Sequence, residues 1–310
     1  MTEYLFTEKY RPKKIDECIL PDHLKTTFQE FINQGNVPNL LLTGTAGIGK
    51  TTVAKAMLEE LDCDYIIING SMNGNIDTLR NEIKNYASAV SFTGGRKYVI
   101  LDEADYLTPT TQAALRNFME EYSNNCGFIM TCNFKNRIIE PLHSRCSVVD
   151  FRILKTDLPK LAMQFLRRAS SILDTENIEY DKKVVASLIT NHCPDWRRVL
   201  NELQRYSVTG KIDEGILVSF SDDNYKSLIM YMKEKNFSKM RKWVAENSDV
   251  DTDVLFKTFY DTAHDYLELS TIPDMILLLA KYQYQAALVA NPEINVVACL
   301  LEIMLVCQFR

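Results

Sequence analysis

The sequence has no long apolar stretch, and it contains little glycine and proline for its length. Of 310 residues, 11 are glycine and 9 are proline, which excludes collagen-like chains and low-complexity disordered chains. The most apolar run covers residues 275–280, far short of the roughly 18 residues that a membrane-spanning helix needs. The first residues carry acids and tyrosines where a secretory signal has a basic flank and an apolar core. We therefore expect the protein to work in the cytoplasm.

Cysteine pairs and an excess of basic residues are also missing. The 8 cysteines include no C-x-x-C pair and have no histidine at ligand spacing, so we expect reduced, mostly buried thiols rather than a structural zinc site. The 35 basic residues are outnumbered by 41 acidic ones, for a net charge of −6. This balance excludes a broad basic surface that coats nucleic acid, although it permits a narrow basic stripe.

The first half of the chain alternates short apolar runs with helical patterns. This alternation is typical of a parallel sheet covered by helices, and apolar runs without alternation are typical of strands buried on both faces. Thr108 and Pro109 predict the start of one of the helices, as cap and first residue. We expect strands at 40–43, 65–69, 98–102, 128–131 and 148–151, and helices at 51–61, 78–88 and 110–122.

After residue 151 only helical patterns remain, which marks a domain boundary. A polar joint at 219–224 precedes a last helical stretch that ends in a very apolar segment, 295–309. That segment is either buried in its own domain or packed against neighbouring subunits. The sequence thus predicts an α/β chain with a sheet domain at 1–155 and two helical domains at 156–220 and 221–310; the first of these has its helices at 158–173, 182–192 and 196–206.

A phosphate-binding pattern, G-x-x-x-x-G-K-[ST], lies between the first predicted strand and the helix after it. It runs from Gly44 to Thr51. Its glycines let backbone N–H groups surround phosphate oxygens, Lys50 reaches the β and γ phosphates, and the Thr51 hydroxyl ligates Mg²⁺. The alternative is a glycine-rich turn with an unrelated lysine, but such a turn has no need to lie between a strand and a helix. We therefore predict a site for ATP and Mg²⁺.

The predicted strand at 98–102 ends in two acids, Asp102 and Glu103. At the carboxyl edge of a parallel sheet they would lie beside the phosphate loop. Asp102 is predicted to hold Mg²⁺, and Glu103 to accept a proton from an attacking water. Residues 102–105 also spell the D-E-A-D box of helicases, but such helicases need a second sheet domain that this chain does not predict.

With these motifs, residues 7 to about 206 resemble the AAA+ ATPase subunits of sliding-clamp loaders. That family includes the replication factor C small subunits, and the T4-like bacteriophage branch is the most similar. The resemblance implies a nucleotide-binding sheet domain, a helical lid and an all-helical collar that joins subunits. The segments that carry it, besides the phosphate loop and the acids, are EKYRP at 8–12, IDECILP at 15–21, ALR at 114–116, TCN at 131–133, SRC at 144–146 and PDWRR at 194–198.

The resemblance also implies roles for particular residues. Asn133 would sense the γ phosphate or orient water, Arg145 would be an arginine finger for the ATP of a neighbouring subunit, and Arg197 would be a sensor from the lid. Proline at 194 stands where many relatives have glycine. The resemblance assigns the base and phosphates of ATP to Thr7, Glu8, Lys9, Tyr10, Ile19, Gly44, Gly47, Ile48, Gly49, Lys50, Thr51, Thr52 and Arg197, and Mg²⁺ to Thr51 and Asp102.

Two cations four residues apart on one predicted helix, Arg80 and Lys84, are neighbours that could contact DNA phosphates. The alternative is an ordinary solvated face. By resemblance the following segment touches the clamp through Val90 and Phe92, unless these residues are buried against their own strand. Arg116 could link DNA contact to Glu103, or simply pair with Glu120 one turn further on.

These observations together predict an ATP-driven clamp loader. Its partners would be the sliding clamp, primer-template DNA bound through its backbone, further copies of the chain and a non-ATPase subunit in a pentameric spiral; a viral protein would work in the host cytoplasm. One alternative is a structural subunit that binds ATP without hydrolysing it. Another is a helicase or other AAA+ remodeller.

Overall fold

The computed structural model describes residues 5–71, 76–89, 95–208, 210–212, 222–247, 252–286, 289 and 291–310, with the backbone alone at 76–78, 222–224 and 253. The chain divides into two compact units, residues 1–216 and 217–310. None of the described helices is long and apolar enough to cross a membrane. The predicted polar joint at 219–224 lies largely outside the described residues, and the predicted three-domain division stays a prediction.

A parallel sheet organises the first unit. Among the described residues it has five strands in the order β2-β3-β4-β1-β5. The predicted strands are confirmed to within two residues at each end, because continuous apolar runs bounded by polar turns have few alternative structures. The strands are β1 (Leu40–Thr43), β2 (Tyr65–Asn69), β3 (Lys97–Asp102), β4 (Cys126–Cys132) and β5 (Ser147–Asp150).

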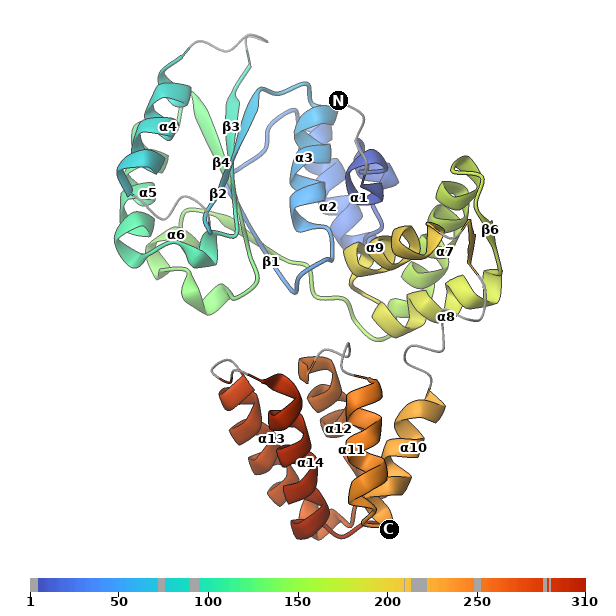
Figure 1. Cartoon of the computed structure of the whole chain (residues 1–310). Coiled ribbons are helices and arrows are strands. Elements are labelled where there is room, and N and C mark those ends of the chain that lie inside the picture. The colour runs from blue at the N-terminus through green and yellow to red at the C-terminus, as the bar shows by residue number, and fades with distance from the viewer. Residues whose placement is uncertain are drawn as a thin grey trace. The chain divides into compact units, whose positions relative to one another are not determined.

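Helices cover both faces of this sheet (Figure 1). Leu40 and Leu42 of β1 pack in one core with Met57, whereas Leu41 packs in the other with Leu115. All three leucines are fully buried, which explains why the strand lacks an alternating pattern. One face carries α2 (Asp22–Asn33) and α3 (Lys50–Glu60), and the other carries α4 (Ile76–Ser88), α5 (Pro109–Glu121) and α6 (Glu140–His143); α1 (Phe6–Lys9) lies on the side of α2 and α3 away from the sheet.

Three helices follow the sheet within the first unit, as predicted: α7 (Leu158–Thr175), α8 (Lys182–His192) and α9 (Trp196–Ser207). The expectation of helices alone after residue 151 is wrong in one detail. Two short parallel strands, β6 (Glu179–Tyr180) and β7 (Lys211–Ile212), pair beside them. Two residues are too few to produce a period-two pattern, so the sequence carries no signal for this pair. The predicted α/β class is confirmed.

The regular elements of the second unit are all helices among its described residues, apart from one isolated antiparallel bridge between Leu267 and Phe309. Its last helix contributes Cys299, Leu300 and Ile303 to the core of the unit, so this face of the apolar terminal segment is buried in its own domain. Ile294 and Leu305 on the same helix are exposed. The helices are α10 (Asp222–Lys233), α11 (Phe237–Glu246), α12 (Thr252–Tyr266), α13 (Ile272–Ala286) and α14 (Pro292–Val306).

The prediction that most of the cysteines are buried is confirmed. All eight are free, and five of them are buried. Burial raises the pKa of the Cys18 and Cys146 thiols to about 12, which makes them poor nucleophiles at neutral pH. Among the described residues no group of histidine, cysteine or acidic side chains could hold a metal ion by itself.

Candidate active site

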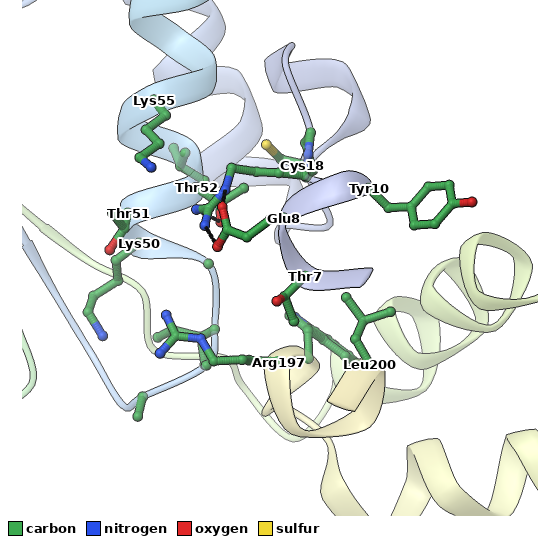
Figure 2. A pocket seen from close by; sticks show the side chains of 18 of the residues that line it. Thr7, Glu8, Tyr10, Cys18, Lys50, Thr51, Thr52, Lys55, Arg197 and Leu200 are labelled. Atoms are coloured by element: carbon green, nitrogen blue, oxygen red, sulfur yellow. Dashed lines mark hydrogen bonds and ion pairs between the residues drawn. The ribbon is translucent and has the colours of Figure 1, made fainter. Parts of the chain in front are cut away.

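A cavity of about 850 Å³ opens at the carboxyl ends of β1, β3 and β4. Its lining combines three parts of the chain: the phosphate loop with the strand ends, residues 5–20 near the N-terminus, and residues of the lid helices α7 and α9. We call the first part the phosphate side and the other two the base side. Figure 2 shows Lys50 and Thr51 on one side of the cavity and Thr7 and Leu200 on the other, with Arg197 reaching from α9 toward the loop.

The phosphate loop has the backbone conformation that its glycines predict. Gly49 has φ +97° and ψ +13°, and α3 begins at the next residue. A side chain would strain this left-handed conformation. α3 therefore begins at the wall of the cavity, and the N–H groups of its first turn, which have no acceptor within the helix, are of the kind that binds anions.

Gly47 allows the phosphate loop to approach the start of α9 closely. A Cβ atom on this residue would lie 1.7 Å from Oδ1 of Asp195, so only glycine fits against that carboxylate. The same Oδ1 accepts a hydrogen bond from the Arg198 N–H at 3.0 Å and caps α9. The helix that carries Arg197 therefore begins directly against the phosphate loop.

The ammonium group of Lys50 joins the loop to the end of β4. Its Nζ donates to the carbonyl oxygens of Gly44 and Thr45 at 2.8 and 2.7 Å, and to Oδ1 of Asn133 at 2.9 Å. Burial lowers the pKa of Lys50, while Cys132, Asp102 and Asp105 oppose this shift. All three ammonium protons are used, so a bound phosphate would have to replace some of these acceptors.

Asp102 lies beside the first turn of α3. Its Oδ1 accepts hydrogen bonds from the hydroxyls of Thr51 and Thr131, each at 2.6 Å. A hydroxyl and a carboxylate oxygen in contact are hard ligands of the kind that Mg²⁺ prefers. The pair fits the predicted metal site, with room for phosphate oxygens and water in the adjoining cavity.

Glu103 follows Asp102 in a left-handed backbone conformation, with φ +57° and ψ +44°. Its side chain lines the cavity, and no hydrogen bond joins its carboxylate to any residue that the structure describes. Such a carboxylate can accept a proton from a water molecule in the cavity.

Asp105 is a residue whose role the sequence did not predict. It is buried, and its Oδ2 accepts the backbone N–H groups of Asn133 and Phe134, both at 3.1 Å. These bonds cap the end of β4 and hold Asn133 in place. The only signal was a third acid in the 102–105 run, which suggested the helicase motif instead.

The base side is held together by contacts between the N-terminal segment and α7 and α9. Arg168 of α7 donates to the carbonyl oxygens of Tyr10 at 2.7 Å and Glu17 at 3.1 Å. The N–H of Phe6 donates to Oε1 of Gln204 on α9 at 2.9 Å. Arg168 and Gln204 both line the cavity, and nothing in the sequence pattern distinguished them.

Most residues assigned to the nucleotide line this cavity, but Lys9 and Gly44 are not among its lining residues. Lys9 points elsewhere: its Nζ bonds to Oε1 of Glu176 at 2.7 Å, and the Tyr10 hydroxyl donates to the same oxygen at 2.6 Å. The assigned residues that do line it are Thr7, Glu8, Tyr10, Ile19, Gly47, Ile48, Gly49, Lys50, Thr51, Thr52, Asp102, Glu103, Asn133 and Arg197.

Arg145 lies outside the cavity of its own chain. Its Nε donates to Oε1 of Glu120 at 2.9 Å, with a second contact from the same guanidinium, and its Nη1 donates to the Pro141 carbonyl at 3.0 Å. Arg116 also pairs with Glu120, at 3.8 Å. The Arg145 guanidinium lowers the pKa of Glu120, so this carboxylate is charged at neutral pH and attracts both arginines.

Arg80 and Lys84 are exposed on α4. Leu79 and Ile83 on the same helix are fully buried in the core. The helix thus has the two faces that its pattern predicts. Val90 and Phe92, the predicted clamp contacts, lie outside the described residues.

Comparison with known proteins agrees with this architecture. Residues 40–154 match the model of the ATPase family associated with various cellular activities, AAA, and residues 157–218 match the lid domain of the sliding-clamp-loader large subunit. The RuvB Holliday junction branch migration motor of Thermotoga maritima has a similar structure, with a TM-score of 0.53 over 72% of this chain and 79% of that one. At 17% identity this likeness concerns the fold alone.

Two relatives are similar in sequence over most of their length. The sliding-clamp-loader large subunit of Enterobacteria phage T4 is 40% identical over 246 residues, which cover 77% of this chain and 76% of the relative. The replication factor C small subunit of Sulfurisphaera tokodaii is 34% identical over 256 residues, covering 79% and 76%. With this identity, the AAA match and the lid match in one chain, the protein belongs to the family of AAA+ sliding-clamp-loader subunits.

Proposed function

We propose that this chain is an ATPase subunit of a DNA polymerase sliding-clamp loader. It would use ATP binding and hydrolysis at subunit interfaces to open a ring-shaped clamp and place it on primer-template DNA. The observation that carries the proposal is the pair of contacts that joins the phosphate loop to neighbouring strand ends in one cavity, Lys50 to Asn133 and Thr51 to Asp102. Both contacts occur in a chain of the clamp-loader family.

Each group at the phosphate side then has a task in ATP hydrolysis. Lys50 and the N–H groups at the start of α3 bind the phosphates, while Thr51 and Asp102 hold Mg²⁺. The metal ion supplies positive charge that offsets the charge on the phosphate oxygens. Glu103 accepts the proton of the attacking water, and Asn133 orients that water. From the base side, Arg197 of α9 contacts the phosphates.

We infer that a cation from outside the chain offsets the remaining negative charge on the transferred phosphate in the transition state. We assign it to Arg145 of a neighbouring copy, since Arg145 lies away from its own cavity and is bonded to exposed groups. A guanidinium delivered to the transferred phosphate contributes about 10³ to 10⁵ in rate. Hydrolysis would then require an assembled ring or spiral. We propose a pentameric spiral of further copies with a non-ATPase subunit.

In this proposal Arg80 and Lys84 bind the phosphate backbone of DNA, and Val90 and Phe92 bind the clamp. Reversing both charges on α4 should weaken DNA binding equally for all sequences and flatten its dependence on salt. Reversal of Lys182 and Lys183, two exposed lysines of α8, is a matched control. An unchanged salt slope in the α4 variant would move the DNA surface elsewhere.

The decisive experiment measures the ATPase rate of the full chain with its loader partner, with and without clamp and primed DNA. We expect a severalfold stimulation that needs both.

Glu103→Gln should trap a complex that holds ATP and clamp, and rapid clamp release by this variant would contradict the role of Glu103. ATP binding with no hydrolysis under any condition would favour the non-hydrolysing subunit. Strand separation driven by ATP without a clamp would indicate another remodeller.

A further inference from the structure

The peptide that carries Glu103 is contacted by both strands that flank β3. Leu101 pairs with Met130 of β4, so Thr131 comes next to the end of β3. On the other side Asn69, the last residue of β2, pairs with Asp102, and Gly70 follows directly. The two contacting residues, Thr131 and Gly70, therefore reach Glu103 from opposite sides.

Thr131 makes two hydrogen bonds at this point. Its Oγ1 donates to Oδ1 of Asp102 at 2.6 Å and accepts the backbone N–H of Glu103 at 3.1 Å. Thr131 is 2% exposed and lies at the wall of the cavity. One hydroxyl thus links the carboxylate of the first acid to the backbone of the second.

Gly70 touches the same peptide from the β2 side. Its N–H donates to the carbonyl oxygen of Asp102 at 2.8 Å. A Cβ atom on Gly70 would lie 2.6 Å from the carbonyl oxygen of Glu103 and 3.2 Å from its carbonyl carbon. Both are backbone atoms that cannot move aside without displacing Glu103, so no side chain fits at this position.

The conformation of Glu103 needs such support. With φ +57°, it occupies a left-handed region that is unfavourable for a residue with a Cβ atom. Strained residues of this kind persist where their surroundings hold them in place. We propose that Gly70 and Thr131 are positioning residues that together hold the Glu103 backbone so that its carboxylate faces the cavity. This inference rests on the proposed function, in which Glu103 is the general base.

The test separates the rate of hydrolysis from ATP binding. A displacement of about 1 Å of a reacting group can cost on the order of 100-fold in rate. We expect Gly70→Ala and Thr131→Val each to lower kcat by about tenfold or more. The Kd for ATP should be unchanged when it is measured without Mg²⁺, since Thr131 also bonds the proposed metal ligand Asp102. Thr131→Ser keeps the hydroxyl and should keep kcat near that of the wild type. Gly35→Ala is the control for general destabilisation: nothing lies within 4 Å of its Cβ position, but its φ of +64° strains any side chain, and Gly35 does not line the cavity.

A double-mutant cycle with Glu103→Gln shows whether the two residues act through Glu103. In that background Gly70→Ala and Thr131→Val should cause little further loss, because the group that they position no longer works as a base. A further loss as large as in the wild type would overturn the inference. If Gly70→Ala does not fold, the comparison of Thr131→Val with Thr131→Ser answers the question alone.

The possible failures are distinct. A wild-type loader complex that does not hydrolyse ATP contradicts the proposed function and this inference with it. A wild-type complex that hydrolyses ATP, together with Gly70→Ala and Thr131→Val variants of undiminished kcat, contradicts the inference alone. Loss of kcat in Thr131→Ser equal to that in Thr131→Val would also contradict it, since the hydroxyl would then be irrelevant.

Discussion

The phosphate side and the base side of the cavity are built in different ways. On the phosphate side the functional groups stand at the ends of adjacent buried strands, and hydrogen bonds such as those of Thr131 link one strand end to the next. On the base side, the N-terminal segment is tied to α7 and α9 by single side chains such as Arg168 and Glu176. These base-side contacts join segments more than 150 positions apart in the chain, so a single substitution can remove one of them.

The largest effect is expected from the loss of Arg145, which tests whether one chain contains every group that ATP hydrolysis needs. Arg145→Ala should lower DNA-stimulated ATP hydrolysis by about 10³-fold or more, because no other group supplies its charge to the transition state. ATP binding should be unchanged, since Arg145 does not line the cavity. Steady-state ATPase and equilibrium ATP binding measure the two quantities.

Arg152→Ala, which removes an exposed arginine after β5, is the control for this change. Full turnover by the Arg145→Ala complex would remove the arginine-finger assignment. It would also mean that a single chain holds every group that hydrolysis needs.

The second prediction concerns Lys50 of the phosphate loop. Lys50→Ala should weaken ATP binding by about 10- to 100-fold, the usual loss for charged hydrogen bonds, measured by calorimetry. Lys55→Ala is the comparison, since Lys55 also lines the cavity but its ammonium has no hydrogen bond to a described residue. Equal losses in the two variants would show that general positive charge, rather than the contacts of Lys50, binds the phosphates.

The third prediction concerns the base side. Arg168→Ala removes two hydrogen bonds that hold residues 10–17 against α7, and we expect ATP affinity to fall by about five- to tenfold. The rate at saturating ATP should be unchanged, because the phosphate side is untouched. Arg167→Ala is the control, since Arg167 is exposed on the same helix. A fall in kcat instead of affinity would show that the two sides are mechanically coupled.

The smallest effect is expected for Glu176→Gln, which weakens the contacts of Lys9 and Tyr10 with α7. Hydrogen bonds from Lys9 and Tyr10 lower the pKa of Glu176 below its ordinary value of 4.5. Its contribution to stability is therefore present above pH 4.5 and is lost as pH falls through the lowered pKa.

Thermal unfolding of wild type and Glu176→Gln should thus differ slightly at pH 7 and converge in acid. Glu179→Gln, at an exposed position on β6, should behave as wild type at both pH values. A difference between wild type and Glu176→Gln that grows in acid would contradict the charged contact.

How far the sequence could predict the site depends on how far apart the contacting residues are in the chain. The phosphate loop, Asp102 and Glu103 were predicted because each lies in a short contiguous pattern of strand, turn and helix. Arg168 contacts Tyr10 across 158 positions, and Phe6 contacts Gln204 across 198. No local pattern reports such a contact. No local pattern marks Gly70 either. Glycine is needed at this position because a side chain would collide with the backbone of Glu103, and not because of the conformation of its own turn.

The sequence by itself determined the five strands of the large sheet, most of the longer helices of the first unit and the phosphate-binding pattern, because these depend on hydrophobic periodicity and on backbone conformations set by neighbouring residues. Only the tertiary structure decided which side chains surround the base side, that Glu120 holds Arg145, and that Thr131 and Gly70 enclose the Glu103 peptide. The physical reason is that hydrogen bonds and close contacts form between whichever groups the packed sheet and helices bring together, and that packing is a property of the whole chain.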